Sequence, residues 1–385
     1  MRPFCIALGI GIILWLQEPS PMALVGLFVT GGIVGARLAI RAQLPGGVGM
    51  VAAGFLIGAS PIVSPENLQT IDPFADIALA WTGLYLGTGL SRAILKNKRL
   101  LIGGLCLYAL PGLTTFCALL LYGMPVQSIL PLAIVAGLSA PSLFDRSDYN
   151  SSEPVPLSLL ATMLGVGLAA LSILPHTFTT ETLVARWGIN VLVWLVGIEL
   201  AYRGLESVRT PTARYCSWFF MAFLLAIVSW HTEMPPLFLA LISGLAISLR
   251  SKHGLRPKAG IPEGEPFIAF ALAYFACTVF VTQQPHWPIP PYIVLSLTML
   301  ILGKLVGGIL ATRLTSQPTK AWLPTLPQGL LATACLGQIS PETPLVIYFA
   351  STAILLPLML SLANYIKPKL RNGRLRALRR RRRAA

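Results

Sequence analysis

Apolar runs of about 15 to 24 residues recur along almost the whole chain, separated by short polar segments. A helix of about 20 apolar residues crosses the hydrocarbon core of a bilayer, so each run is long enough, or nearly so, to span a membrane. Only 11% of the 385 residues are charged, whereas soluble domains carry about 25%. The sequence therefore predicts an all-α integral membrane protein with no separate soluble domain.

We count about fourteen predicted transmembrane helices. Their approximate limits are 3–17, 22–40, 46–64, 72–90, 100–123, 126–145, 155–175, 183–202, 215–231, 235–250, 265–283, 290–312, 320–338 and 343–365. Lysine and arginine collect in cytoplasmic loops. One alternating set of loops holds nearly all of them, and the other holds glutamate and histidine. We therefore predict that both termini are cytoplasmic, in a membrane that we expect to be a bacterial inner membrane.

The excess of positive charge lies mostly at the end of the chain. The formal net charge is +15, and segment 367–385 holds ten of the 29 lysines and arginines. A basic segment next to a membrane helix is attracted to anionic lipid headgroups, by about 1 kcal/mol per basic residue. No interleaved aromatic residues accompany it, so we expect lipid headgroups and no nucleic acid as its partners.

Two predicted helices are interrupted at mid-depth by proline, glycine and polar residues. The sixth contains Gly137-Leu138-Ser139-Ala140-Pro141, and the thirteenth contains Pro327-Gln328-Gly329. A broken helix is tolerated inside a membrane where its exposed backbone lines a cavity. The two lie seven helices apart, so they run in opposite directions, and each is fourth in a unit of five. Such inverted repeats with paired discontinuous helices are typical of secondary transporters.

This pattern divides the chain into five parts. They are two extra N-terminal helices (1–45), a first inverted repeat (46–175), linking helices (176–234), a second inverted repeat (235–366) and a basic cytoplasmic tail (367–385). The alternative is that the prolines are ordinary kinks, which are frequent in membrane helices. The matched position of the breaks favours a transport site between the repeats.

Lys304 lies about fourteen residues into its predicted helix, too deep to reach either interface easily. An uncompensated lysine at the centre of a bilayer costs at least roughly 2.5–3.5 kcal/mol. We therefore expect Lys304 to face the interior of the bundle and either to pair with an acid or to lose its proton, which makes it a candidate proton carrier. The alternative is an ammonium group in a water-filled inlet. The neighbouring glycines predict close helix contact.

Other functional classes are disfavoured. The sequence has no Walker-type glycine loop, no Ser/His/Asp or metal-ligand cluster and no Cys-x-x-Cys pair. We expect no enzyme activity, no bound metal and no cofactor. Asp145 follows the first break, either as a vestibule acid or as the start of a polar loop. Near the ends of other helices, Asp76 is expected in solvent and Glu199 in a surface pair with Arg203.

Several motifs resemble the monovalent cation:proton antiporter superfamily, which has the sodium/proton exchanger fold. The resemblance covers roughly residues 22–365. The motifs are Leu44-Pro45-Gly46-Gly47-Val48-Gly49, Gly83-Leu84-Tyr85-Leu86-Gly87-Thr88-Gly89-Leu90, Ser139-Ala140-Pro141 and Leu326-Pro327-Gln328-Gly329, together with Lys304 at the family's basic position. It implies alternating access, a monovalent cation and a proton as substrates, and a homodimer.

One departure from the family concerns the site itself. The family binds its cation and proton on one or two aspartates in the helix after the first break, and here that alignment places Ala161 and Thr162 at the acidic positions. No carboxylate occurs in the predicted helix 155–175, so Lys304 lacks its usual partner. Neutral oxygens from Thr162 and Ser139 could bind a cation, but they cannot titrate.

Three interpretations stay open. Lys304 could be neutral and carry the proton, Asp145 could replace the missing acid, or Lys304 and the N-termini of the broken helices could bind an anion. The leading prediction is a secondary transporter of the cation:proton antiporter type. Its predicted site residues are Lys304, Thr162, Ser139, Pro141, Asp145 and Gln328. The alternatives are an anion or small organic-solute carrier on the same fold, and a non-transporting degenerate exchanger that acts as a regulatory or assembly partner.

Overall fold

The computed structural model is helical throughout the part of the chain that it describes. The described residues are 20–42, 44, 46–60, 63–88, 95–138, 160–161, 194–199, 202–203, 210–232, 234–250, 260–282 and 291–315. The predicted first, thirteenth and fourteenth helices and the basic tail lie outside these ranges, as do most of the seventh and eighth. The count of fourteen therefore extends beyond the described residues.

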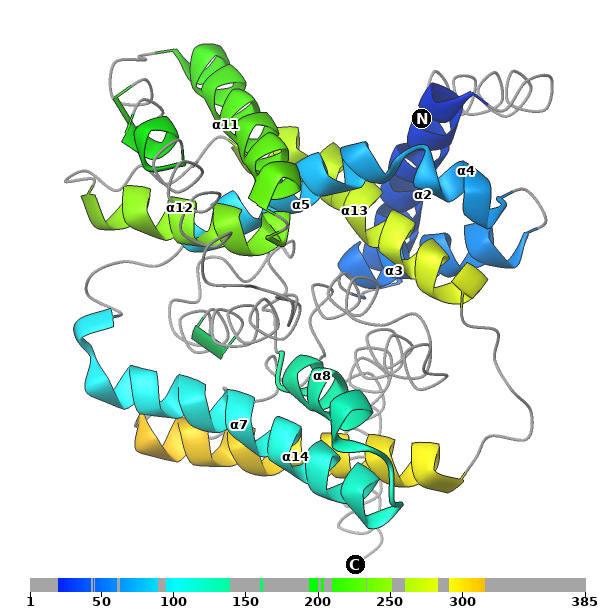
Figure 1. The fold of residues 1–385 in the computed structure, drawn as a ribbon, viewed down its shortest axis with the longest axis vertical. Coiled ribbons are helices and arrows are strands. Elements are labelled where there is room, and N and C mark those ends of the chain that lie inside the picture. Colours follow the sequence, from blue (N-terminus) through cyan, green and yellow to red (C-terminus); the bar gives the residue numbers. More distant parts are fainter. Residues whose placement is uncertain are drawn as a thin grey trace, which may run out of the picture.

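The described helices follow the predicted ones closely (Figure 1). They are α2 (Pro21–Arg41), α3 (Gly46–Ala59), α4 (Pro65–Gln69), α5 (Asp72–Thr88), α7 (Lys98–Leu121), α8 (Val126–Ala136), α11 (Pro211–Thr232), α12 (Pro236–Arg250), α13 (Gly260–Thr282) and α14 (Pro291–Leu314). Among them, α2, α7 and α14 are long and apolar enough to cross a membrane, and α3, α12 and the apolar parts of α11 and α13 are shorter. The short helix α4 was not predicted.

Polar side chains cap several helices where they begin. The Ser20 hydroxyl accepts a hydrogen bond from the Ala23 amide (3.2 Å), and Pro21 follows at the first helical position of α2. Ser64 and Pro65 repeat this arrangement at α4. The Asn97 side chain accepts from the amides of the first turn of α7. These caps satisfy amides that have no partner inside the helix.

Glycines let α5 and α12 approach until their backbones touch. A Cβ placed on Gly83 would lie 2.4 Å from the Leu237 carbonyl oxygen, and one on Gly87 would lie 2.2 Å from that of Leu241. Because residue numbers rise together along both helices, α5 and α12 are parallel. Their close approach maximises van der Waals contact, which is what holds helices together in lipid.

The pair formed by α3 and α13 has the same geometry. A Cβ on Gly54 would lie 2.2 Å from the Ala273 carbonyl oxygen, and Gly58 faces Cys277 one turn further along. These two helices are therefore also parallel. In contrast, α2 is antiparallel to α3, with Gly35 of α2 lying directly against Gly49 of α3.

Helices α7 and α14 form an antiparallel pair, seen side by side in Figure 1. A Cβ on Gly303 would lie 2.7 Å from the Cα of Pro111, and one on Gly307 would lie 3.1 Å from the Cys106 carbonyl oxygen. The predicted close contact at the glycines beside Lys304 is confirmed at both positions. The half-length helix α8 packs on α7, with Gly137 against the ring of Tyr108.

These directions are the ones that the alternation of loop charge predicts. In the predicted order, α3 and α13 are the third and eleventh helices and α5 and α12 the fourth and tenth, so each pair should be parallel. The fifth and twelfth, α7 and α14, should be antiparallel. All three expectations agree with the packing. Each crossing of the membrane reverses the direction of the chain. The agreement therefore tests whether the number of membrane crossings between the two helices of each pair is odd or even.

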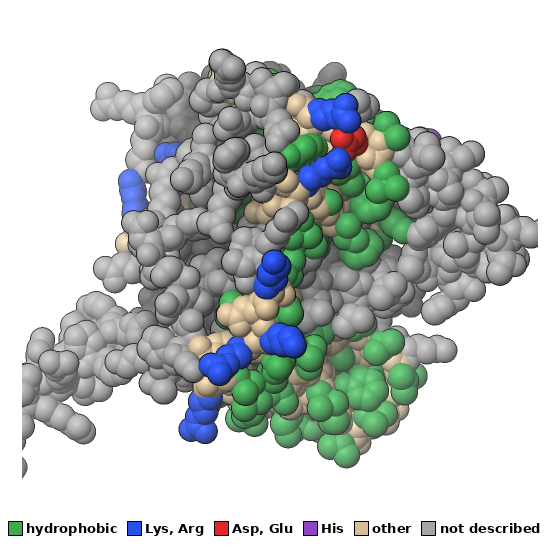
Figure 2. Space-filling view, turned by 90° about the vertical axis from the view of Figure 1, so that its left-hand side faces the viewer, with side chains coloured by type: hydrophobic (Ala, Val, Ile, Leu, Met, Phe, Trp, Pro, Cys, Tyr) green, Lys and Arg blue, Asp and Glu red, His purple; other side chains and the backbone are tan. Residues whose placement is uncertain are grey.

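The outer faces of the helices carry large apolar side chains. Leu121 at the end of α7 is 81% exposed and Phe220 of α11 is 61% exposed. Figure 2 shows extensive apolar surface of this kind, with lysine and arginine side chains arranged along one face of the molecule. Exposed apolar surface on this scale, on helices long and apolar enough to cross a bilayer, is the surface that lipid contacts. The chain is an integral membrane protein.

The close contact at Gly87 predicts a large effect of a single methyl group. In Gly87→Ala the new Cβ meets backbone atoms of α12, which cannot rotate away, so α5 and α12 must separate. We expect a lower melting temperature, with an overpacking cost of about 1–3 kcal/mol. Gly26→Ala in α2 is the matched control, because nothing lies within 4 Å of its new Cβ. Equal melting temperatures for the two variants would contradict the packing.

Candidate functional site

Lys304 faces the interior of the protein. Its residue is 1% exposed and is among the largest fully buried side chains. The ammonium nitrogen Nζ donates a hydrogen bond to the backbone carbonyl of Leu138, at 3.3 Å. Leu138 lies two residues after α8 ends at Ala136 and directly before Ser139. The buried lysine of α14 therefore reaches the point where the first predicted break begins.

The carbonyl that Lys304 contacts belongs to the C-terminal end of a short helix. The last carbonyls of a helix lack partners within it, and the helix dipole gives that end a partial negative charge. Both effects favour a cation at Leu138. A protonated Lys304 is thus stabilised by backbone groups, which partly offset the cost of burying its charge. An anion at this end of α8 would be repelled.

No carboxylate pairs with Lys304 among the described residues. The ion pairs found there both involve Glu199, which binds Arg203 (2.9 Å) and Arg250. The predicted surface pair of Glu199 and Arg203 is thus confirmed, and Arg250 of α12 joins it, with its guanidinium group over the Tyr202 ring. These charges stabilise one end of α12 and take no part in the Lys304 site.

Ala161 occupies an apolar contact between helices. It is fully buried and packs with Leu107 and Tyr108 of α7 and with Ala311 of α14. Tyr108 is also the residue whose ring meets Gly137 at the end of α8. The position to which the resemblance assigns an acid is therefore filled by a methyl group, with apolar neighbours that would not stabilise a charge.

The crossing of α7 and α14 positions Lys304. Its neighbour Gly303 lies against Pro111, and the Thr114 hydroxyl donates a hydrogen bond to the Met299 carbonyl of α14 (2.9 Å). The same hydroxyl lies 3.0 Å from the Leu110 carbonyl of its own helix, so its single hydrogen is shared between the two acceptors. The backbone of α14 is therefore held against α7 in the turn that leads to the lysine, and the ammonium group reaches the end of α8.

Of the predicted site residues, the structure places only Lys304. Ser139, Pro141, Asp145, Thr162 and Gln328 lie outside the described residues. The crossing of the two breaks, expected from the sequence, therefore stays a prediction.

Sequence reasoning missed three polar features. The hydroxyl of Thr115, in α7, is fully buried and has no hydrogen-bond partner. Asp76 was expected in solvent, but it is half-buried and accepts a hydrogen bond from the Trp230 indole of α11 (2.6 Å). Asp72, one turn earlier, accepts from the Tyr274 hydroxyl of α13. The available signal was the spacing of the two acids, four residues apart at the start of an apolar run, which places them on one face of the helix. Their partners lie about 150 and 200 residues away in the sequence, so no local pattern identifies them.

The fold resembles that of a known transporter. The structure of the sodium proton antiporter MjNhaP1 from Methanocaldococcus jannaschii at pH 8 is 14% identical in sequence, with a TM-score of 0.59, over 89% of this chain and 98% of that chain. An electron-microscopy structure of the same antiporter gives the same identity and TM-score over 91% and 96%. No protein-family model matches this sequence, and no curated protein matches it significantly. The likeness shows that the chain has the sodium/proton antiporter fold.

Thr115 and Thr114 should respond in opposite ways to loss of the hydroxyl group. In Thr115→Val a methyl group replaces a buried hydroxyl that has no partner, so we expect the free energy of unfolding to rise by about 1 kcal/mol. In Thr114→Val the bond to Met299 is lost, and the melting temperature should fall. Thermal unfolding in detergent measures both. A fall of the same size in both variants would mean that Thr115 has a partner.

Proposed function

We propose that this protein is a secondary transporter that exchanges a monovalent cation for a proton by alternating access. The observation that carries the proposal is the buried Lys304, whose ammonium group meets the C-terminal end of the half-length helix α8. It occurs on a fold shared with a protein described as a sodium proton antiporter. The ammonium group of Lys304 can lose its proton, and a free monovalent cation can then bind the helix-end carbonyl in its place.

Lys304 is the proton carrier in this proposal. When it is protonated, its ammonium group donates a hydrogen bond to the Leu138 carbonyl and fills the place next to it. A sodium or potassium ion at about 4 Å would be repelled by roughly 4 kcal/mol at an effective dielectric of 20, so the two positive charges exclude each other. When Lys304 loses its proton, the carbonyl becomes available to the ion. Competition of this kind couples one cation to one proton without an aspartate.

The remaining predicted site residues complete the ion site in this proposal. Ser139, Pro141 and Gln328 belong to the two breaks, and Thr162 follows Ala161, so they supply neutral oxygens and exposed backbone around the ion. Asp145 attracts cations to the cytoplasmic vestibule. With Ala161 in the usual acidic position, these ligands bind sodium more weakly than a carboxylate would.

The helix packing supports the proposed inverted repeats at 46–175 and 235–366. An inversion that exchanges the two repeats matches α3 with α12 and α5 with α13. It therefore converts the parallel pair of α5 and α12 into the pair of α13 and α3, which is also parallel and also held by glycine contacts. The antiparallel pair of α7 and α14 maps onto itself. We extend the proposal to a homodimer in a bacterial inner membrane, with cytoplasmic termini and the tail 367–385 on anionic lipid.

Proteoliposomes with an imposed pH gradient test the proposal. Pulses of sodium, lithium or potassium should dissipate the gradient with the wild-type protein, and Lys304→Gln should lower the rate to that of protein-free vesicles. Arg313→Gln is the matched control, since Arg313 lies on the same helix but is exposed in its last turn. We expect it to transport normally.

Two results would replace the proposal. If no cation dissipates the gradient and Lys304→Gln behaves as the wild type, cation exchange is wrong and a regulatory or assembly role is favoured. If an anion binds to the wild type and not to Lys304→Gln, the anion-carrier alternative is correct.

A further inference from the structure

Helix α7 has a proline in its interior, at Pro111. Proline has no amide hydrogen, so the carbonyl of Leu107, one turn earlier, loses the donor that an α-helix would give it. Leu107 is 1% exposed and packs with Ala161 and Ala311, whose side chains have no hydrogen-bond donor. A buried carbonyl that has lost its donor destabilises a protein unless another group binds it.

The internal repeat gives this proline the position that the buried lysine has in the other half of the chain. When α7 is aligned with α14 from first residue to last, Pro111 falls on Lys304. The same offset aligns residues 72–74 at the start of α5 with residues 265–267 in α13, and both segments read acid, proline, phenylalanine. The proposed inversion exchanges α7 with α14, so Pro111 and Lys304 occupy equivalent positions on the two helices.

Contacts between α7 and α14 place the carbonyl of Leu107 at the level of the lysine. Gly303 lies against Pro111, and a Cβ on Gly307 would lie 3.5 Å from the Cα of Leu107. Lys304 lies between the two glycines along α14, so it is level with the turn of α7 that leads from Leu107 to Pro111. A helix carbonyl points along the axis toward the residue four positions later, so the Leu107 oxygen points into this turn.

The end of α8 meets the same turn of α7. A Cβ on Gly137 would lie 2.5 Å from the carbonyl oxygen of Tyr108, the residue after Leu107. Gly137 directly precedes Leu138, whose carbonyl accepts the hydrogen bond from Lys304. Two helices therefore bring carbonyls without helical donors close to the lysine, α7 at its proline and α8 at its end.

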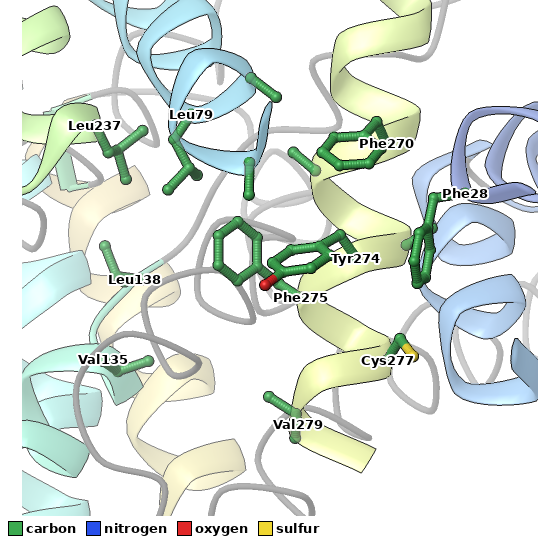
Figure 3. Close-up of a cluster of buried hydrophobic side chains, with 14 of the residues drawn as sticks. Phe28, Leu79, Val135, Leu138, Leu237, Phe270, Tyr274, Phe275, Cys277 and Val279 are labelled. Carbon is green, nitrogen blue, oxygen red and sulfur yellow. The ribbon is translucent and has the colours of Figure 1, made fainter. Parts of the chain in front are cut away.

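The groups around these two carbonyls are largely apolar. In Figure 3 the side chain of Leu138 lies across from those of Leu79 and Leu237, and all three belong to one buried cluster. Next to Leu107, the side chain of Ala161 offers only a methyl group at the position where the resemblance expects an acid. Backbone oxygens are therefore the cation ligands that this part of the described structure offers.

We propose that the carbonyl of Leu107 is a ligand of the transported cation, together with that of Leu138, and that Pro111 makes it available. This inference rests on the proposed exchange of a cation for the proton of Lys304. Carbonyl dipoles can replace the hydration shell of a monovalent cation, and a second oxygen lowers the cost of removing that shell. The proline thus frees an oxygen ligand where the side chain of Ala161 supplies none.

Pro111→Ala tests this ligand because it restores the missing amide, which should bond to the Leu107 carbonyl and withdraw it from the cation. In proteoliposomes with an imposed pH gradient, the sodium concentration at half-maximal rate should rise several-fold, with little change in the maximal rate. In detergent, the sodium concentration that half-saturates the rise in melting temperature should increase by a similar factor. Without sodium the melting temperature should equal or exceed that of the wild type, because alanine favours a helix.

Two controls accompany this variant. Hydrogen exchange measured by mass spectrometry should show that the amide introduced at position 111 is protected, as a bond to the Leu107 carbonyl requires. Pro266→Ala is the matched substitution, since it replaces the internal proline of another helix, α13. It should change neither the half-saturating sodium concentration nor the maximal rate.

The outcomes separate this ligand from the exchange itself. A protected amide with an unchanged half-saturating concentration would overturn the ligand and leave cation exchange in place. The same holds for a lower maximal rate alone, which would assign Pro111 to the shape of α7, and for an unprotected amide, which would mean that another group already binds the carbonyl. If the wild type responds to sodium, lithium and potassium in neither measurement, the proposed function fails and this inference fails with it.

Discussion

Backbone contact between helices at glycine residues is the constraint on which this structure depends. Lipid tails are as apolar as leucine, so burying leucine between helices gains little over leaving it in lipid. Helices that touch at Gly83, Gly87 and Gly303 gain dense van der Waals packing that longer side chains would prevent. The same contacts set the directions and spacing of α5, α12, α7 and α14. They therefore also position Lys304 opposite the end of α8.

The features that followed from the sequence are those fixed by the membrane itself. Hydropathy located the helices, because a bilayer demands a minimum apolar length, and loop charge predicted the relative directions of α5 and α12. The interior position of Lys304 followed from the cost of placing an ammonium group in lipid. Close contact at Gly303 and Gly307 followed from their lack of side chains. Each of these depends on one residue or one run and on the solvent around it.

The features that did not follow depend on which residues meet across the fold. That Lys304 would bond to the Leu138 carbonyl needs the crossing angle of α7 and α14, which no local pattern supplies. Asp76 was expected in solvent because it lies near a helix end, but Trp230 of α11 reaches it. The pairing of Asp72 with Tyr274 joins residues about 200 positions apart. Nothing in the sequence around Thr115 indicates that its hydroxyl lacks a partner, because that depends on how α7 packs.

The partner of Lys304 has a genetic consequence. An ion pair between two side chains can be lost by mutation of either, and a charge swap can restore it. The partner here is a main-chain carbonyl, which every residue type at position 138 would provide. Mutation can remove this interaction only at the lysine codon or by displacing the backbone of α14 or the end of α8, and no compensating charge elsewhere would be selected in its place. The interaction is thus inherited through one side chain and the shape of the backbone.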